Sequence, residues 1–420
     1  MTRRKKTQKA DKPIDLLSAS LKRNIRRHLK ALGFSKGPDG ELIPPAVTKE
    51  AIRALHVTQR DELLQEQRQF ISEAWPRLKQ FFARGEDLDP TKIAPRLEIV
   101  DAGTMESDLF RLASLVWSVP VSAGYGRRIR FLVWDKSNGK LMGLIALGDP
   151  VFNLRVRDKW IGWSARQRKR RLVNVLDAYV LGALPPYNAL LCGKLIASLI
   201  CTTDVRNVFT KKYGSQKGSI SKKRKKPRLC LVTTSSALGR SSVYNRLALN
   251  GEKLLEPIGY TEGWGHFHIS NSLFIQMRRF LHRKKDRYAK NYKYGDGPNW
   301  RMRALRRTLD LLGMNPDLLR HGVKREVFVA KIALNAKNTL LGKSERVRYR
   351  KLRSVSDIGA QAVQRWVLPR ATTRQEYRLW TLEQTAALLG LKSHDALNSS
   401  AVKAATRPVA IDGKAIQTSS

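Results

Sequence analysis

Apolar residues recur at helical spacing through the first quarter of the chain. The segment 13–32 predicts a helix that ends near Gly33. Between residues 48 and 83 the same spacing predicts one long helix or two in tandem, which Pro76 would kink or break. The basic residues 1–13 lack such a pattern and predict a disordered arm. The chain before residue 96 is therefore expected to form a basic arm and a helical region.

From residue 96 to residue 270, short apolar runs alternate with helical stretches. Strands are predicted over residues 96–102, 130–135, 140–148, 172–184 and 228–236. Helices are predicted over residues 107–117, 190–209 and 241–249, and two further strands around a Gly-rich turn over 253–270. The pair Asn138-Gly139 is typical of the tight turn in a β-hairpin. This alternation predicts an α/β core over residues 96–270.

The order of these elements resembles that of the GNAT acyltransferase fold, a mixed sheet with helices on both faces. GNAT enzymes hold the pyrophosphate of acyl-CoA on a Gly-rich turn at the start of the helix after the fourth strand, through backbone amides. The matching segment here, PPYNALLCGK, has one glycine, Gly193, where the GNAT pattern has two at short spacing. The resemblance therefore implies a GNAT-like fold, whereas the missing glycine predicts that acetyl-CoA does not bind.

Composition narrows the class of protein. The chain has 420 residues, is 42% apolar and carries a net charge of +45, so it is expected to fold and to favour a polyanionic partner. Its three cysteines predict neither a disulfide framework nor a structural zinc site. No secretory signal is evident, and the most apolar stretch, 178–201, is interrupted by a Pro-Pro pair and a lysine. We therefore expect a cytoplasmic location and no membrane partner.

The positive charge is concentrated in the middle of the chain. Residues 151–350 contain 43 Lys and Arg against 12 Asp and Glu. Nucleic acid is the expected partner, with DNA as the first candidate, because phosphate neutralisation would supply most of the affinity. RNA is a second candidate on charge alone. An anionic membrane is a third, but neither a basic amphipathic helix with bulky apolar anchors nor a lipidation motif is evident in the sequence.

Two basic segments and two Gly-containing loops, one of which ends with Arg127 and Arg128, are candidates for nucleic-acid contact. Residues 148–171 interleave basic and aromatic residues, a pattern typical of phosphate contact with base stacking. The run SKKRKKPR at 221–228 would contact phosphates without reading sequence. The loop in 233–247, ahead of a predicted helix, suits a phosphate. The candidate residues are Arg127, Arg128, Arg155, Arg157, Trp160, Trp163, Arg166, Arg168, Lys169, Arg170, Arg171, Lys222, Lys223, Arg224, Lys225, Lys226, Arg240, Ser241 and Ser242.

Each of these segments also has a structural interpretation. The aromatic residues of 148–171 would pack in the core, and the charges around them would be solvated surface. The run 221–228 would be a solubilising loop, and one serine of 233–247 would be a helix N-cap. The sequence alone leaves both interpretations open.

Four residues are weak candidates for catalysis: Tyr187, His266, His268 and Asp149. The two histidines alternate along a predicted strand and would share one face, where a nearby aspartate would complete a metal site or an acid–base pair. No third ligand stands at fixed spacing, so structural histidines are the better interpretation. A tyrosine nucleophile would need a positive pocket, and packing is the better interpretation for it as well. We predict no cofactor, and a metal ion only if the protein processes DNA.

The C-terminal 150 residues are expected to be mainly helical. Residues 271–370 form a basic helical region. Residues 371–420 form a tail in which 380–405 resembles a helix-turn-helix, with Gly390 in the turn. Its recognition helix would present Lys392, Ser393, His394 and Asn398. The alternative is an ordinary helical hairpin.

A longer series of motifs resembles one protein family. In chain order the motifs are GRRIRFLVWD, LIALGDPVFNL, RDKWIGW, LDAYVLGALPPYNALLCGKLIASL, TTSSALGRSSVYNRL, EPIGYTEGWGHFHI and RHGVKREVFVA. This series resembles the Druantia anti-phage protein A family over about residues 14–370. The resemblance implies bacterial antiviral defence, partner subunits of the defence system and related domains associated with mobile elements. It supplies no catalytic residue.

These observations lead to one hypothesis and two alternatives. The hypothesis is a DNA-binding component of a bacterial anti-phage system that binds mainly through phosphate contacts. The first alternative is a nuclease or strand transferase of a mobile element, for which carboxylates are scarce, since residues 151–250 contain three acids. The second alternative is an acyltransferase.

Overall fold

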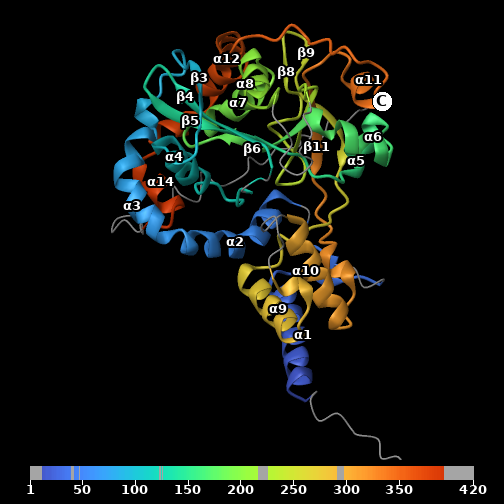
Figure 1. The fold of residues 1–420 in the computed structure, drawn as a ribbon. Helices are drawn as coiled ribbons and strands as arrows, with labels where there is room; N and C mark the ends of the chain where they lie inside the picture. The colour runs from blue at the N-terminus through green and yellow to red at the C-terminus, as the bar shows by residue number, and fades with distance from the viewer. Residues whose placement is uncertain are drawn as a thin grey trace, which may run out of the picture.

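Seven strands form one mixed β-sheet at the centre of the protein (Figure 1). The computed structural model describes residues 12–38, 42–46, 48–122, 124, 126–215, 226–290 and 298–391. Across the sheet the strands are β10 (Glu256–Tyr260), β11 (Glu326–Lys331), β7 (Leu231–Ser235), β6 (Val175–Ala183), β5 (Lys140–Gly148), β4 (Arg128–Asp135) and β3 (Pro95–Ile99). The predicted mixed α/β fold is confirmed, and this order is compatible with a GNAT-like arrangement.

One pair of neighbouring strands in this sheet, β6 and β7, is parallel, and the others are antiparallel. The parallel pair is short: it runs from Val175 opposite Leu231 to Asp177 opposite Thr233. Beyond these positions β6 pairs only with β5, and β7 only with β11. The two halves of the sheet therefore diverge where β6 and β7 end their pairing.

Helices cover both faces of the sheet. Alternate residues of β4 enter different cores, with Phe131 and Val133 in one and Leu132 and Trp134 in the other. The first core includes α7 (Cys192–Leu199), α8 (Thr203–Tyr213) and α12 (Val355–Ala362), and the second includes α3 (Arg68–Leu78) and α4 (Met105–Ser114). Burial on both faces explains why the central strands are continuous apolar runs in the sequence.

The predicted hairpin is confirmed between β4 and β5. Asp135 pairs with Lys140 across the turn, and Gly139 has a φ of +69°. A left-handed backbone at this position favours glycine, which explains the Asn-Gly pair.

Three helices form a second body with a core of its own, which we call the helical lobe. It consists of α1 (Lys12–Ala31), α9 (Asn271–Arg283) and α10 (Pro298–Leu311) with their adjoining turns, and it lies below the sheet in Figure 1. The helix predicted over 13–32 is thus confirmed. From the lobe, α2 (Lys49–Glu66) runs along the sheet, and its first turns add Ile52 and Leu55 to the core of the lobe.

Shorter elements complete the described structure. They are β1 (Ser35–Lys36), β2 (Leu42–Ile43), α5 (Arg155–Ile161), α6 (Ala165–Arg171), β8 (Ala248–Leu249), β9 (Glu252–Lys253), α11 (Ala336–Leu341), α13 (Leu368–Thr373) and α14 (Leu382–Leu388). The helices α5, α6 and α11 pack together beside β10. Within the described residues, every helix is too short or too polar to cross a membrane.

The helical stretch 48–83 differs from its prediction in where it breaks. It forms α2 and α3, which are separated at Gln67, and Pro76 lies inside α3. Pro76 lies in the last turn of α3, where it removes one helical hydrogen bond, and α3 ends two residues later at Leu78.

Two predicted elements after β7 are wrong. Residues 242–246 form turns rather than a helix: the Ser241 hydroxyl accepts the Tyr244 N–H at 2.9 Å as an N-cap would, but Arg246 takes a left-handed φ of +56°, which ends the helical turn. Of the two strands predicted over 253–270, only β10 forms in the sheet. Residues 261–270 are a loop with one isolated bridge, from Trp264 to Arg320.

The sheet extends beyond the range 96–270 in which the sequence placed it. Its seventh strand, β11, lies inside the stretch 271–370 that was predicted to be helical, and it pairs with both β7 and β10. In the tail, α14 ends at Leu388 and is followed by Gly390 with a φ of +75°. The recognition helix of the predicted helix-turn-helix lies outside the described residues, so that motif stays a prediction.

Candidate nucleic-acid interface

The central basic segment contains arginines that stabilise the fold rather than face solvent. The Arg157 side chain is fully buried, and its Nη2 lies 2.7 Å from Asp158 Oδ1. Its guanidinium also donates to the carbonyl oxygens of Val151 and Phe152. Burial lowers the pKa of Arg157, and the charge of Asp158 opposes this shift. Arg157 therefore cannot contact DNA from this position, which corrects its place among the candidates.

Three other candidate arginines form ion pairs. Arg168 Nη1 lies 2.9 Å from Asp158 Oδ2, so that carboxylate is shared with Arg157. Arg127 lies 2.8 Å from Asp149 and donates to the carbonyl of Val173. Arg155 lies 2.7 Å from Glu262, but 83% of its side chain is exposed, so it remains accessible. Arg128 is exposed, and its backbone N–H and C=O bond to the Tyr213 hydroxyl.

The two candidate tryptophans pack α5 and its following turn against α11. The Trp163 indole N–H donates to the Leu340 carbonyl at 2.7 Å. Lys337 Nζ lies 4.1 Å from the centroid of the Trp160 ring. Both side chains are partly buried in the same cluster as Leu340. This placement favours the structural interpretation of both rings over base stacking.

The remaining candidates divide by exposure. Arg166, Lys169 and Arg170 are exposed on one face of α6, Arg171 is partly buried, and Lys226 and Arg240 are exposed. Ser241 is buried, and its N–H donates to Glu326. Ser242 accepts from Lys49 Nζ at 3.3 Å. Because no helix begins here, the predicted helix N-terminus for a phosphate does not exist. Lys222, Lys223, Arg224 and Lys225 lie outside the described residues.

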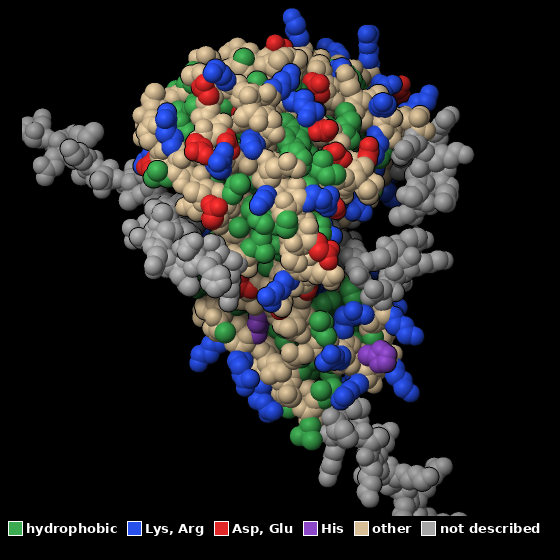
Figure 2. All heavy atoms as spheres, turned by 90° about the vertical axis from the view of Figure 1, so that its left-hand side faces the viewer, with side chains coloured by type: hydrophobic (Ala, Val, Ile, Leu, Met, Phe, Trp, Pro, Cys, Tyr) green, Lys and Arg blue, Asp and Glu red, His purple; other side chains and the backbone are tan. Residues whose placement is uncertain are grey.

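The helical lobe carries the strongest positive charge, which the list of candidates missed. In the described ranges 12–38, 271–290 and 298–320, the sequence has 19 Lys and Arg against 4 Asp and Glu. Figure 2 shows Lys and Arg side chains gathered over the lobe, whereas on the sheet they are interspersed with acids. Both ion pairs of the described lobe belong to Arg307, which contacts Asp286 and Asp310.

A stripe of four cations follows the outer face of α1. Leu21, Ile25 and Leu29 bury one face of this helix in the core of the lobe. The stripe on the opposite face consists of the exposed residues Arg23, Arg26, Arg27 and Lys30. Residues at this spacing lie above one another on a helix. The sequence predicted this helix but assigned no role to its cations, although the spacing of Leu21, Ile25 and Leu29 is the signal that could have indicated which face is buried.

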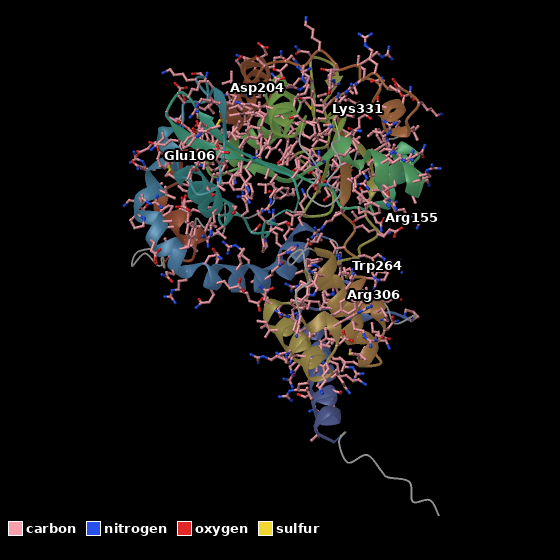
Figure 3. The ribbon with its side chains drawn as sticks, in the orientation of Figure 1. Glu106, Arg155, Asp204, Trp264, Arg306 and Lys331 are labelled. Carbon is pink, nitrogen blue, oxygen red and sulfur yellow. The ribbon has the colours of Figure 1, made fainter. Side chains whose placement is uncertain are left out.

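Exposed arginines also lie on the other two helices of the lobe. Arg279 and Arg283 are exposed on α9, and Arg303 and Arg306 are exposed on α10. In Figure 3, Arg306 lies on the same side of the molecule as Trp264 and Arg155, which are both exposed. The acidic residues Asp204 and Glu106 lie away from this side, on α8 and α4, which pack against the sheet.

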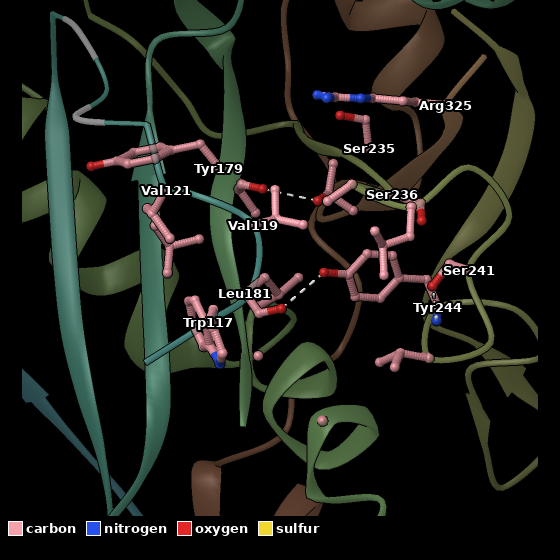
Figure 4. Close-up of a pocket in the computed structure, with 18 of the residues that line it drawn as sticks. Trp117, Val119, Val121, Tyr179, Leu181, Ser235, Ser236, Ser241, Tyr244 and Arg325 are labelled. Atoms are coloured by element: carbon pink, nitrogen blue, oxygen red, sulfur yellow. Dashed lines mark hydrogen bonds between the residues drawn. The ribbon is translucent and has the colours of Figure 1, made fainter. Parts of the chain in front are cut away.

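A cavity of about 680 Å³ opens where β6 and β7 diverge (Figure 4). Its walls come from the segment 117–122, the second half of β6, and the turns that follow β7. Tyr244 reaches across the opening and donates from its hydroxyl to the Leu181 carbonyl at 2.8 Å. The Asp177 carboxylate accepts from the Thr233 hydroxyl at 2.5 Å. Burial raises the pKa of Asp177 to about 6, against the opposing effects of Thr233 and Arg157.

The weak catalytic candidates are not brought together by the fold. Tyr187 is fully buried, and its hydroxyl bonds to Asp135 at 3.1 Å and to Asn138. Burial and Asp135 raise the pKa of Tyr187 far above its ordinary value, so it is not an accessible nucleophile. Asp149 lies in the wall of the cavity, paired with Arg127. Across the described part of the chain, no group of three or more His, Cys, Asp or Glu side chains is placed to hold a metal ion.

The two histidines lie in a turn where the lobe meets the sheet, not on a strand as predicted. His268 is buried, and its Nε2 lies 2.9 Å from the Leu318 carbonyl oxygen. Burial lowers the pKa of both His266 and His268 to about 4. Two further buried histidines contact Phe267 in the same place: His56 stacks on its ring, and His321 packs edge-to-face against it.

Comparison with known proteins identifies the family. A family model described as Druantia protein DruA matches residues 46–342. A relative named Druantia protein DruA, from Escherichia coli (strain UMEA 4076-1), is 53% identical over 368 residues, which cover 87% of this chain and 91% of the relative. No solved structure matches the chain. Both matches agree with the resemblance drawn from the motifs, and the chain belongs to the Druantia protein DruA family.

Proposed function

We propose that the protein binds DNA as a component of Druantia anti-phage defence, and that the helical lobe supplies most of its phosphate contacts. Family membership supports the role in defence, together with the expectation of partner subunits. The observation that carries DNA binding is the cationic stripe on α1, whose residues form no ion pair with any described residue. Such a surface repels itself unless a polyanion neutralises it.

The dimensions of the stripe suit the backbone of a nucleic acid. Seven residues of helix separate Arg23 from Lys30, which corresponds to about 10 Å along α1. Double-stranded DNA carries one charge per about 1.7 Å of its axis, so several phosphates lie within this length. Arginine and lysine contacts of this kind position a duplex without reading its sequence. We therefore expect binding with little sequence preference.

The salt dependence of DNA binding tests the proposal. For six to ten phosphate contacts, the logarithm of the affinity for duplex DNA should fall against the logarithm of salt concentration with a slope of about −5 to −9. The variant R23A/R26A/R27A/K30A should bind more weakly, with a slope smaller in magnitude by about 3 to 4. Fluorescence anisotropy over a salt series measures both values, and the same series on RNA compares the two nucleic acids.

A variant of equal charge change serves as the control. Lys79, Lys92, Arg96 and Lys136 are exposed residues near β3 and β4, where acids are interspersed. Replacing these four by alanine should leave the slope within about one unit of the wild-type value. Equal losses in the two variants would show that net charge alone matters, and an unchanged slope in the α1 variant would refute the role of the lobe.

A further inference from the structure

The cavity between β6 and β7 has a cationic rim and polar walls that the proposed DNA contacts do not use. Its volume of about 680 Å³ lies in the range of small-molecule pockets. Five basic side chains from four separate segments line it: Lys49, Arg53, Lys194, Arg240 and Arg325. The two carboxylates in its lining are already engaged, Asp149 by Arg127 and Asp177 by Thr233.

Arg325 is the most unusual of these residues. It enters the cavity from the residue before β11 and lies beside Ser235 in Figure 4. Among the described residues, no carboxylate forms an ion pair with its guanidinium, and its Nε is buried without a hydrogen-bond partner. Its ring contact is Phe267, at 5.3 Å from the guanidinium carbon to the centroid. Arg325 is partly buried and has no counter-ion among the described residues, so its guanidinium has lost part of its hydration, and an anionic ligand would compensate for that loss.

The rest of the cavity suits a flat polar group rather than a simple anion. Trp117, Tyr179 and Tyr244 supply aromatic surface, and Ser235 and Ser236 supply hydroxyls beside Arg325 (Figure 4). The Asp177 carboxylate can accept further hydrogen bonds from a ligand beyond the one from Thr233. Aromatic faces together with a few placed polar groups are how proteins hold nucleobases.

We propose that this cavity binds one nucleotide unit, with its phosphate at Arg240 and Arg325 and its base and sugar along the aromatic wall beside Asp177. The argument is independent of the lobe, because it uses none of the lobe's exposed cations. Such a unit exists as a free nucleotide and as the terminal residue of a DNA strand. The fold relates the two sites, because α2 carries Lys49 and Arg53 into the rim and Ile52 and Leu55 into the core of the lobe.

Thermal stability and calorimetric titration of the full chain test the proposal. Deoxyadenosine monophosphate at low millimolar concentration should raise the melting temperature and bind measurably. Deoxyadenosine, which lacks the phosphate, should bind at least tenfold more weakly, and so should inorganic phosphate. Acetyl-CoA should bind more weakly than the nucleotide, because Tyr244 crosses the opening and Gly193 is the single glycine of its segment.

Variants of the cavity rim test where the phosphate of the nucleotide binds. R240Q removes an exposed cation of the rim, and R246Q makes the same charge change on an exposed residue of the same loop that does not line the cavity. R240Q should weaken nucleotide binding at least tenfold, whereas R246Q should not. R325M should abolish the binding without lowering the melting temperature of the free protein, because it removes a partly buried charge that has no counter-ion among the described residues. If R325M does not fold, the pair at 240 and 246 still decides the question.

The lobe variant R23A/R26A/R27A/K30A separates this proposal from DNA binding by the lobe. It should bind the mononucleotide as the wild type does, whatever becomes of its affinity for duplex DNA. In that variant, a short 5′-phosphorylated strand that displaces the mononucleotide would identify a strand end as the ligand, and a strand that does not would identify the free nucleotide. Absence of nucleotide binding, equal binding by R240Q, or tighter binding of acetyl-CoA or inorganic phosphate would overturn the proposal.

Discussion

Replacing Asp158 by asparagine should lower the free energy of unfolding by about 3–5 kcal/mol, because it leaves a fully buried guanidinium without its counter-ion. Arg157 has no exposed side-chain surface, and the Asp158 side chain is 10% exposed. The Asp158 carboxylate accepts from Arg157 at 2.7 and 2.9 Å and from Arg168 at 2.9 Å. It is therefore a single anion shared between two cations.

Asparagine would fill the same volume but could not replace this charge. Its amide oxygen can still accept from Arg157, but its amide N–H groups would then face Arg168, donor against donor. The two bonds from Arg157 to the carbonyls of Val151 and Phe152 would remain, so the loop before α5 keeps its path. The expected cost is accordingly that of an uncompensated buried charge rather than of a cavity.

Urea unfolding followed by tryptophan fluorescence measures this loss. Trp163 is a local reporter, because its ring centroid lies 5.5 Å from the Arg157 guanidinium carbon. The transition midpoint should fall while the dependence of free energy on urea stays the same. Asp101 is exposed, so the variant D101N is the control and should change the free energy of unfolding by less than about 0.5 kcal/mol.

A double-mutant cycle with R157M strengthens the test. Since both single variants break the same ion pair, the loss in the double variant should be smaller than the sum of the two single losses. If D158N has the midpoint of the wild type, or if the two losses simply add, Arg157 is not the desolvated partner of Asp158 and this account of the central segment is wrong.

Two further predictions concern the same segment and the histidines. R168A should lower the free energy of unfolding by about 1–3 kcal/mol, because it removes a partner of Asp158. The variant R166A/K169A/R170A removes exposed cations and should change this free energy by less than about 1 kcal/mol. Urea unfolding compares the two variants, and equal midpoints would contradict the structure. Burial lowers the pKa of His56, His266 and His268 to about 4, so the unfolded chain binds more protons between pH 6.5 and 4. Stability should therefore be full above pH 6.5 and fall towards pH 4, and the variant H56Q should flatten this fall in urea unfolding at pH 7 and 4.5.

Much of the sheet was predictable, because the sequence signals for its strands lie within the strands and the turns that join them. The runs at 130–135 and 140–148 are apolar on both faces, and the short loop between them contains Asn138-Gly139, in which Gly139 takes the left-handed backbone that favours glycine. The same holds for α1, whose apolar spacing defines its buried face. Elements with strong periodicity and a clear turn signal need no distant partner to be recognised.

The failures depend on partners that are distant in sequence. Residues 242–246 are held as turns in part by Glu326, which accepts from the Ser241 N–H and the Asn245 amide. The strand β11 finds its place between β7 and β10 across long stretches of helix and loop, and no local pattern assigns it to the sheet. The cavity arises from the same pairing, since it exists where β6 leaves β7.

For the candidate interface, the sequence showed which segments are basic but not which of their cations are buried, paired or exposed. Arg157 and Arg166 look alike in a run of basic residues, yet one is fully buried against its neighbour Asp158 and the other is exposed on α6. Burial of an arginine depends on which strands and helices surround it, and that is tertiary information. The stripe on α1 would have been the better signal, because the spacing of Leu21, Ile25 and Leu29 on the predicted helix indicates which of its cations point outward.

The distinction between paired and unpaired cations matters when the net charge of a protein in this family is used to locate a binding surface. An arginine that shares a carboxylate, such as Arg168, contributes to stability, and the carboxylate neutralises its charge before any ligand binds. An unpaired exposed cation, such as Arg26, contributes self-repulsion until an anion neutralises it. The lobe concentrates cations of the second kind, and Arg325 is a partly buried cation in the cavity with no counter-ion among the described residues. Since folding alone gains nothing from either, both locations are where a phosphate ligand would recover the largest electrostatic free energy.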